Sequence, residues 1–526
     1  EGSKWRSPQR PVASQMSVFN GLVSSIALLA GAALACPVLA DPWAMPGDMV
    51  LREDIQRLAD AGVISSPVTT WPMPWATIDA DLERASRLAE LPPAVQAARA
   101  RVAARLARIR GLHGIQPVAE LGARTDSFWL RGFEDTPREE NHIRAGASWM
   151  GERFAVRLQA TFTADPLPGD QEWRADGSYA AVVLGNHILS GGAVDRWWGP
   201  SWDHSLIYSN NARPVAGFTL ERNVAKPFGT KWLSWLGAWT YNLHWGFLGH
   251  DREVPNARLL AFRLGFRPTR DLEFGLARTA IWCGEGRPCD AKALWNVIVG
   301  RDNRGGEGIT EENDPSNQLF ALDLRWQAPF GDGPWAIYTQ AVAEDEAGGF
   351  PSRWFGQFGA ELWGSIGHGW LAGNWRARLE YTDTLVHFWQ AEPYYDLAYE
   401  HGIYETGYRF EGRSLGSSAD GDSAVVTAGA SLVRDDGSSW NARAGWAEIN
   451  REGDGIGRDL RHTVTSEEVK SLFLNVSHRR EVVLDRLNLG YITLGLGVSR
   501  QDNQVRDETD TEFQAFAQWT WDFSGI

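Results

Sequence analysis

The feature that most constrains the fold is a strict alternation of apolar and polar side chains with a period of two, which recurs from about residue 121 onward. In RFAVRLQATFT (153–163), Phe154, Val156 and Leu158 share one face, while Arg157 and Gln159 lie on the other. A period of two is that of a β-strand. The same pattern recurs in LLAFRLGFR (259–267), LFALDLRWQ (319–327) and FQAFAQWTWDF (513–523).

These predicted strands run for about nine to eleven residues, the length that crosses a bilayer at a tilt. One face carries Arg, Gln and Asp, and the other is apolar and edged by some of the 27 tryptophans. A soluble sandwich also alternates, but its strands are shorter, about five or six residues. The pattern therefore predicts an all-β fold, a transmembrane outer-membrane β-barrel of antiparallel strands around a wet lumen. At about 20 to 25 residues per strand, it predicts sixteen to twenty strands.

The N-terminus predicts export. Lys4, Arg6 and Arg10 precede the apolar run VFNGLVSSIALLAGAALACPVLA (18–40), which ends in Val38-x-Ala40. A basic region, an apolar region and a small-residue cleavage site predict that residues 1–40 are a cleaved secretory signal. A lipoprotein signal at Cys36 is the weaker alternative, because Ala33 and Leu34 are in the wrong order for it. After this segment no stretch of about twenty apolar residues remains, which excludes helical spanning.

Residues 41–114 are predicted to form a small three-helix unit ahead of a barrel at 115–526. Asp48 is the predicted N-cap of the first helix, which Gly62 ends, and Thr77 is the predicted cap of the second. A third helix follows Pro92-Pro93 and runs to Gly111. One face of it carries a row of arginines, which we expect to be solvated or paired with acidic residues, with a membrane-surface role as the alternative: Arg99, Arg101, Arg105 and Arg108.

The cysteines and the net charge limit which metal sites and binding partners the sequence supports. Cys283 and Cys289 flank Gly and Pro in WCGEGRPC, which in an exported protein predicts a local disulfide, with a metal pair as the alternative. A net charge of -15 disfavours nucleic-acid binding. We predict no cofactor; calcium is conceivable only as a bridge between carboxylates and an acidic polymer.

Catalytic patterns are weak. GRSLG (412–416) matches Gly-x-Ser-x-Gly, but a nucleophile elbow needs a strand before it and a helix after it, and the residues around Ser414 have a loop composition. The sequence has no His-Glu-x-x-His, no phosphate-binding loop and no complete calcium loop. We therefore predict that the protein is not an enzyme.

Binding chemistry is more prominent, in HFWQAEPYYDLAYEHGIYETGYRF (387–410). Aromatic faces can stack on the apolar face of a sugar ring, while charged groups pair with its hydroxyls. An interfacial aromatic belt or a packed loop is the alternative. The candidate glycan-binding residues here are Trp389, Tyr394, Tyr395, Tyr399, Tyr404 and Arg409.

A second aromatic stretch is RWWGPSWDHSLIYSNNARP (196–214). It combines turn residues with Asp, His and Asn, which a lipid-facing strand would not tolerate. We interpret it as a lumen-facing or loop segment that fixes the barrel interior, and direct sugar contact is the alternative. The residues to test are Trp197, Trp198, Asn210, Asn211 and Arg213.

Four stretches in order, at 51–72, 196–214, 278–289 and 399–423, resemble those of the Wzi-like capsule-assembly family. The resemblance implies a barrel of about eighteen strands, closed on its periplasmic side by the helical unit. It also implies a lectin in the outer membrane of a Gram-negative bacterium, which helps attach exported capsular polysaccharide to the cell surface. The chain ends in WDFSGI, so the expected barrel-assembly signal is Phe523.

The implied partners are capsular or another surface polysaccharide, outer-membrane lipids and the barrel assembly machinery, with the protein as a monomer. Two other functions compete with the lectin. A porin-like sugar or ion channel requires an open lumen and conducts ions. A barrel hydrolase requires a pair of catalytic carboxylates, and the sequence offers only scattered acidic residues in loops.

Overall fold

The structure is a computed structural model that describes residues 42–87, 91–112, 114–125, 130–167, 170–300, 316–347, 350–451, 462–484 and 487–522. All of them belong to one compact unit. The predicted signal sequence and Phe523 lie outside the described residues. Of the helices in the described part, none is long and apolar enough to cross a membrane.

The dominant feature is a closed antiparallel barrel, whose order contains nineteen strands. β7 (Trp173–Arg174) has only two residues, and β6 pairs directly with β8 beside it, so the wall has 19 - 1 = 18 strands. This confirms the predicted all-β barrel. The wall consists of β4 (Ile115–Arg124), β5 (Asn141–Met150), β6 (Phe154–Thr163), β8 (Tyr179–Leu184), β9 (His187–Ala193), β11 (Ala216–Arg222), β12 (Ala238–Phe247), β13 (Arg258–Arg267), β14 (Leu272–Trp282), β15 (Ser316–Gln327), β16 (Trp335–Ala347), β17 (Phe350–Ile366), β18 (Gly373–Asp383), β21 (Ala424–Arg434), β22 (Ser439–Ile449), β23 (Val469–Leu484), β24 (Leu487–Asn503) and β25 (Glu508–Asp522).

The last strand closes the barrel against the first, with Phe516 opposite Arg124 and Asp522 opposite Val118. The smaller elements are β1 (Trp43–Ala44), β2 (Thr70–Trp71), β3 (Met73–Pro74), β10 (Trp197–Trp198), β19 (Arg409–Phe410), β20 (Arg413–Ser414), the 3-10 turns η1 (Ala85–Arg87) and η2 (Ser234–Leu236), and the helices α2 (Met49–Asp60), α3 (Trp75–Arg84), α4 (Pro93–Gly111) and α5 (Ala291–Val299).

The predicted alternation is present in the wall. On β6, Leu158 is exposed on the outside while its neighbour Arg157 is buried, and on β25 the same holds for Phe513 and Gln514. Apolar side chains on this outer surface suit contact with the hydrocarbon of a bilayer. Pairing between neighbouring strands satisfies the backbone amides, as a bilayer requires. The outside of the wall is therefore the lipid-facing surface.

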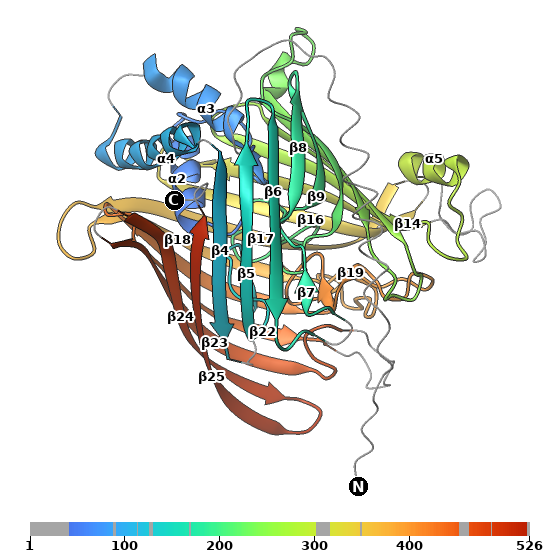
Figure 1. Ribbon diagram of the computed structural model, residues 1–526. Helices are drawn as coiled ribbons and strands as arrows, with labels where there is room; N and C mark the ends of the chain where they lie inside the picture. The colour runs from blue at the N-terminus through green and yellow to red at the C-terminus, as the bar shows by residue number, and fades with distance from the viewer. Residues whose placement is uncertain are drawn as a thin grey trace. The chain divides into compact units, whose positions relative to one another are not determined.

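The two ends of the barrel differ. Short turns such as 185–186 and 435–438 join strands at one end, whereas 194–215 and 384–423 connect strands at the other. We call them the short-turn end and the long-loop end. In outer-membrane barrels short turns face the periplasm and long loops the outside. α2, α3 and α4 lie together at the short-turn end, with β19 toward the other (Figure 1).

The three predicted helices are present. Asp48 caps α2, with its Oδ1 accepting from the amide of Leu51 at 2.9 Å, and the helix ends just before Gly62, which has φ +76°. The predicted cap Thr77 is wrong, because Thr77 lies inside α3. Its hydroxyl instead donates to the carbonyl of Asn223 at 2.9 Å, in a turn of the barrel. A tertiary contact thus uses the hydroxyl that a cap would have used.

The arginine face of α4 pairs with acidic residues of α2 and its cap. Arg101 makes two hydrogen bonds to the carboxylate of Asp54, at 2.8 and 2.6 Å, and Arg105 lies 2.7 Å from the carboxylate of Asp48. Burial raises the pKa of Asp54 to about 6 even though Arg101 opposes the shift. The face therefore holds the helical unit together, as the salt-bridge interpretation predicts.

Paired charges fill the barrel at the depth of α2. Arg376 of β18 is fully buried and lies 2.7 Å from Glu53, 2.9 Å from Asp60 and 3.1 Å from Glu361. Buried charges are tolerated when each has a partner of opposite sign. At this depth, acidic side chains of α2 therefore pair with arginine on the inner face of the wall.

Candidate functional site

The stretch between β9 and β11 folds into the barrel. Trp197 and Trp198 form β10, which pairs with β2 of the N-terminal unit, with Trp197 opposite Trp71. Both predicted glycan-contacting tryptophans are fully buried. The ring of Trp197 packs edge-on to Phe133, with 5.5 Å between ring centroids. This position agrees with our interpretation of 196–214 as a segment that fixes the interior.

A single strand residue holds the middle of this stretch. The carboxylate of Glu380 accepts from the hydroxyl of Ser201 at 2.5 Å and from the backbone amides of Trp202 and Asp203 at 2.7 and 3.0 Å. It also accepts from the hydroxyl of Tyr338 at 2.7 Å. All four donors are buried, so this carboxylate supplies the hydrogen bonds that water would otherwise make.

Asp203 carries a second anchor. Its carboxylate accepts from Arg378 of β18 at 3.1 and 3.2 Å. Burial by itself raises the pKa of Asp203, but the guanidinium groups of Arg378 and Arg443 outweigh it and lower the pKa to about 2. Asp203 is therefore ionised at neutral pH and is the counter-ion of Arg378 and Arg443 in the wall.

The polar residues at the end of the stretch also make hydrogen bonds within the protein. Asn210 donates to the carbonyl of Phe133 at 3.1 Å, and Asn211 donates to the carbonyl of Ser414 at 3.0 Å. Arg213 binds the carboxylate of Asp176 through two hydrogen bonds, at 2.8 and 2.9 Å. These three predicted site residues join loops to one another.

The second long insertion, 384–423, packs against the first. The hydroxyls of Tyr399 and Tyr408 donate to the carbonyls of Leu206 and Ile207 at 2.7 and 2.6 Å. The hydroxyl of Tyr404 donates to the carbonyl of Cys283 at 3.2 Å. All three tyrosines are buried, so Tyr399 and Tyr404 fasten loops and expose no ring face to a sugar.

Arg409 is an ion-pair centre in the same insertion. It binds the carboxylate of Asp420 through two hydrogen bonds of 2.9 Å and lies 2.5 Å from Glu400. Burial raises the pKa of Asp420, but Arg409 opposes it and holds the pKa well below its usual range. The structure thus places Arg409, a predicted glycan-binding residue, in buried ion pairs within the insertion.

Three of the predicted aromatic residues are exposed on the same insertion: Trp389, Tyr394 and Tyr395, at 57%, 50% and 37%. We call these three residues the aromatic platform. His387 lies between two of them, with its ring centroid 5.3 Å from Trp389 and 5.4 Å from Tyr394. The amide of Tyr394 donates to the carbonyl of Val386 at 3.0 Å, which fixes the turn.

An unusual carboxyl group adjoins the platform. Asp396, next to Tyr395 in the chain, donates its amide to Oδ2 of Asp422 at 2.8 Å, while Oδ1 of Asp422 is buried and accepts no hydrogen bond from the described residues. Burial raises the pKa of Asp422 to about 8. The protonated carboxyl can both donate and accept. Sequence reasoning missed Asp422, and its only signal is the turn-forming Asp-Gly-Asp at 420–422.

The predicted disulfide is present: Cys283 and Cys289 are bonded, with 4.5 Å between their Cα atoms. The alternative of a metal pair is therefore excluded for these cysteines. Within the described ranges, no group of three or more His, Cys, Asp or Glu residues could hold a metal ion.

A family model described as capsule assembly protein Wzi matches residues 114–514. The chain belongs to the Wzi capsule-assembly family. It is 29% identical over 459 residues to an uncharacterized 55.8 kDa protein in the cps region of Klebsiella pneumoniae, covering 87% of this chain and 86% of that protein. It also resembles the solved structure of Wzi from Escherichia coli, with 26% identity, a TM-score of 0.74, and coverage of 92% of this chain and 99% of that one. That protein is described as an outer membrane protein involved in group 1 capsule assembly and a carbohydrate-binding β-barrel.

The Wzi-family barrel locates this chain in the outer membrane of a Gram-negative bacterium. In this Wzi-family protein, Ser414 lies in β20 and is fully buried. Its Oγ accepts from the amide of Gly416 at 3.1 Å, which leaves it inside a turn rather than at a solvent-exposed elbow.

Proposed function

We propose that this protein is a non-enzymatic lectin that binds exported capsular or other surface polysaccharide and helps attach it to the cell surface. The Escherichia coli relative is a carbohydrate-binding barrel involved in capsule assembly, which supports the proposal. We further propose that residues 41–114 close the periplasmic side, that the mature chain begins after residue 40, and that the protein is a monomer folded by the barrel assembly machinery.

The observation that carries the proposal is the aromatic platform on a loop at the long-loop end. Elsewhere in the insertion 384–423, Tyr399, Tyr404 and Tyr408 are buried and hydrogen-bonded, so the platform differs in exposure from the other tyrosines of the insertion. Exposed aromatic rings cost free energy in water unless they meet a ligand. Sugar rings offer apolar faces on which these exposed aromatic rings can stack.

Whether the lumen is filled or open distinguishes a binding protein from a porin-like channel. The stretch 194–215 contacts Glu380 and Arg378 of the wall, and α2 contacts Arg376. The insertion 384–423 packs on the stretch 194–215 through Tyr399 and Tyr408. A channel would need a continuous path past these groups. The filled interior therefore favours a binding protein over a porin-like channel, and conductance in a planar bilayer tests this directly.

The decisive experiment measures binding of the purified, detergent-solubilised protein to the source strain's own surface polysaccharide. The test variant combines Trp389→Ala, Tyr394→Ala and Tyr395→Ala. At about 0.5 to 1.5 kcal/mol per ring, the variant should weaken binding by at least tenfold. The matched control is Trp370→Ala, because Trp370 is also highly exposed but lies in a turn at the short-turn end.

Saturable binding that the triple variant loses and the control retains would support the lectin. Equal binding by both variants would move the site away from the platform. Absence of binding by the wild type, together with ion conductance, would refute the proposal and establish a channel.

A further inference from the structure

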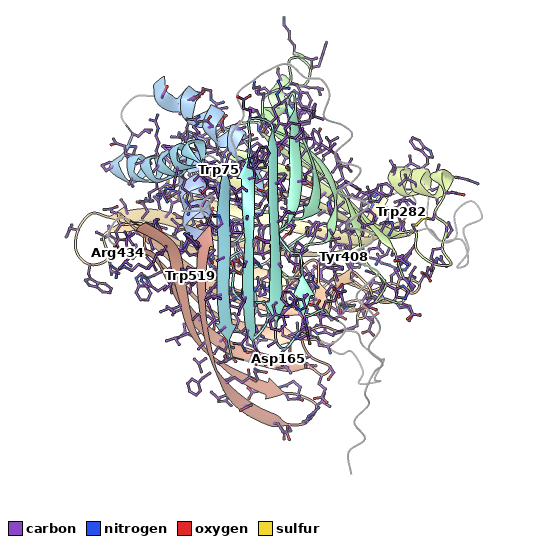
Figure 2. All side chains as sticks on the ribbon, viewed as in Figure 1. Trp75, Asp165, Trp282, Tyr408, Arg434 and Trp519 are labelled. Carbon is purple, nitrogen blue, oxygen red and sulfur yellow. A yellow bond between two sulfur atoms is a disulfide. The ribbon has the colours of Figure 1, made fainter. Side chains whose placement is uncertain are left out.

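The helix α5 lies on the outside of the barrel wall. It follows the disulfide loop after β14 and stands at the side of the barrel (Figure 1). Its residues Val297 and Leu294 pack with Ala280, Trp282 and the neighbouring outward-facing side chains Trp245 and Leu260. Figure 2 labels Trp282 beside the helix. These wall residues belong to the lipid-facing surface, since their strand neighbours Leu259 and Ala261 are fully buried on the inner face.

The helix is built to stay in this place. Oδ1 of Asp290 caps it by accepting from the amide of Ala293 at 2.7 Å, and Gly300 ends it in the left-handed conformation. Arg278, an outward-facing residue of β14, donates to the carbonyl of Ile298 at 2.9 Å. The bond between Cys283 and Cys289 shortens the chain that leads into it. These contacts hold α5 against the outside of the wall.

The face of α5 that points away from the wall is also apolar. Trp295 is 60% exposed and Ile298 49%, and Val299 is exposed beside them. These positions are spaced three and four apart and share one face. A helix that is apolar on both faces is normally surrounded by protein or by lipid. Because this face continues the lipid-facing surface of β12 to β14, lipid is the occupant that the position favours.

Two cations flank this helix without an ion-pair partner. Arg258 stands opposite Trp282 on the next strand, with its guanidinium 4.9 Å from the Phe247 ring and one hydrogen bond, to the carbonyl of Asn256. Lys292 is exposed in the first turn of α5. Neither has a carboxylate within 4.0 Å among the described residues, whereas Lys470, at the same end of the barrel, pairs with Glu448 at 3.1 Å.

We propose that α5 and the adjoining wall of β12 to β14 form a binding site for lipopolysaccharide, the lipid of the outer leaflet. Its acyl chains pack on Trp295, Ile298 and Val299, and its phosphate groups bind Lys292 and Arg258. The long-loop end places the site at the outer leaflet, and basic side chains at that depth attract anionic head groups. Such a site places the proposed polysaccharide-binding barrel in direct contact with lipopolysaccharide.

The test counts retained lipids on the full chain by native mass spectrometry. The protein is exchanged into detergent with lipid A bearing two phosphates, with dephosphorylated lipid A, with phosphatidylglycerol or with phosphatidylcholine. One variant combines Lys292→Gln with Arg258→Gln, and another combines Trp295→Ser with Ile298→Ser. Lys470→Gln is the matched control, since it removes an outward-facing lysine that already has an acidic partner. The urea unfolding transition in detergent, followed by tryptophan fluorescence, verifies that each variant is folded.

We expect the wild type and the control to retain phosphorylated lipid A in preference to the other three lipids. In the charge variant, retention of phosphorylated lipid A should fall about thirtyfold, the value for two basic groups near a membrane surface, and both forms of lipid A should be retained alike. The serine variant should lose both forms. Equal retention by wild type and charge variant would overturn the phosphate site. A dimer of the wild type that the serine variant converts to monomer would assign the apolar face to a second copy instead.

Discussion

Replacing Glu380 by alanine tests how the interior of the barrel is held. The change removes the acceptor for the hydroxyls of Ser201 and Tyr338 and for the backbone amides of Trp202 and Asp203. The hydroxyls can rotate toward other acceptors, but the two amides are fixed by the chain and stay buried. An unpaired buried donor costs about 1 to 3 kcal/mol, so the free energy of unfolding should fall by about 2 to 6 kcal/mol.

The assay is urea unfolding of the folded protein in detergent, followed by tryptophan fluorescence, with ion conductance measured in parallel. Glu380→Gln keeps one oxygen with two of the four donors, so about half the loss is expected. Glu392→Ala is the control, because Glu392 is exposed in the same region of the chain. A loss below about 1 kcal/mol for Glu380→Ala, with no gain in conductance, would refute the view that this carboxylate anchors the stretch 194–215.

Three further outcomes are expected from urea unfolding. Burial lowers the pKa of His204 from 6.5 to about 4, so the unfolded chain binds a proton that the folded chain refuses; the free energy of unfolding should fall by about 3 kcal/mol as pH drops from 6.5 to 4, and His204→Asn should remove that slope. The raised pKa of Asp422 has the opposite sign: the folded chain keeps a proton that the unfolded chain releases, so stability should decline as pH rises from about 4 to about 8, and Asp422→Asn should flatten this part of the profile. Replacing Cys283 and Cys289 by serine should lower the free energy of unfolding by about 2 kcal/mol, the value for a short closed loop, and a reductant should have the same effect on the wild type and none on the variant.

The local elements followed from the sequence because short-range physics sets them. The alternation in 153–163 needs only the period of a strand, and the cap at Asp48 needs only the amide of Leu51 three residues on. The disulfide joins residues six apart. Thr77 failed as a cap because the competing partner, Asn223, lies 146 residues away. Where a residue type suits two roles, contacts with residues distant in the sequence decide which role it takes.

The candidate site shows the same division more sharply. The sequence by itself determined an antiparallel barrel with a helical unit ahead of it. It also identified the aromatic segment 387–410 as a candidate binding segment. Only the tertiary structure separated Trp389, Tyr394 and Tyr395, which are exposed, from Tyr399 and Tyr404, which are buried. The physical reason is that burial depends on what the fold brings up to each ring. The hydroxyl of Tyr399 meets a carbonyl 193 residues earlier in the chain, and no local pattern encodes that meeting.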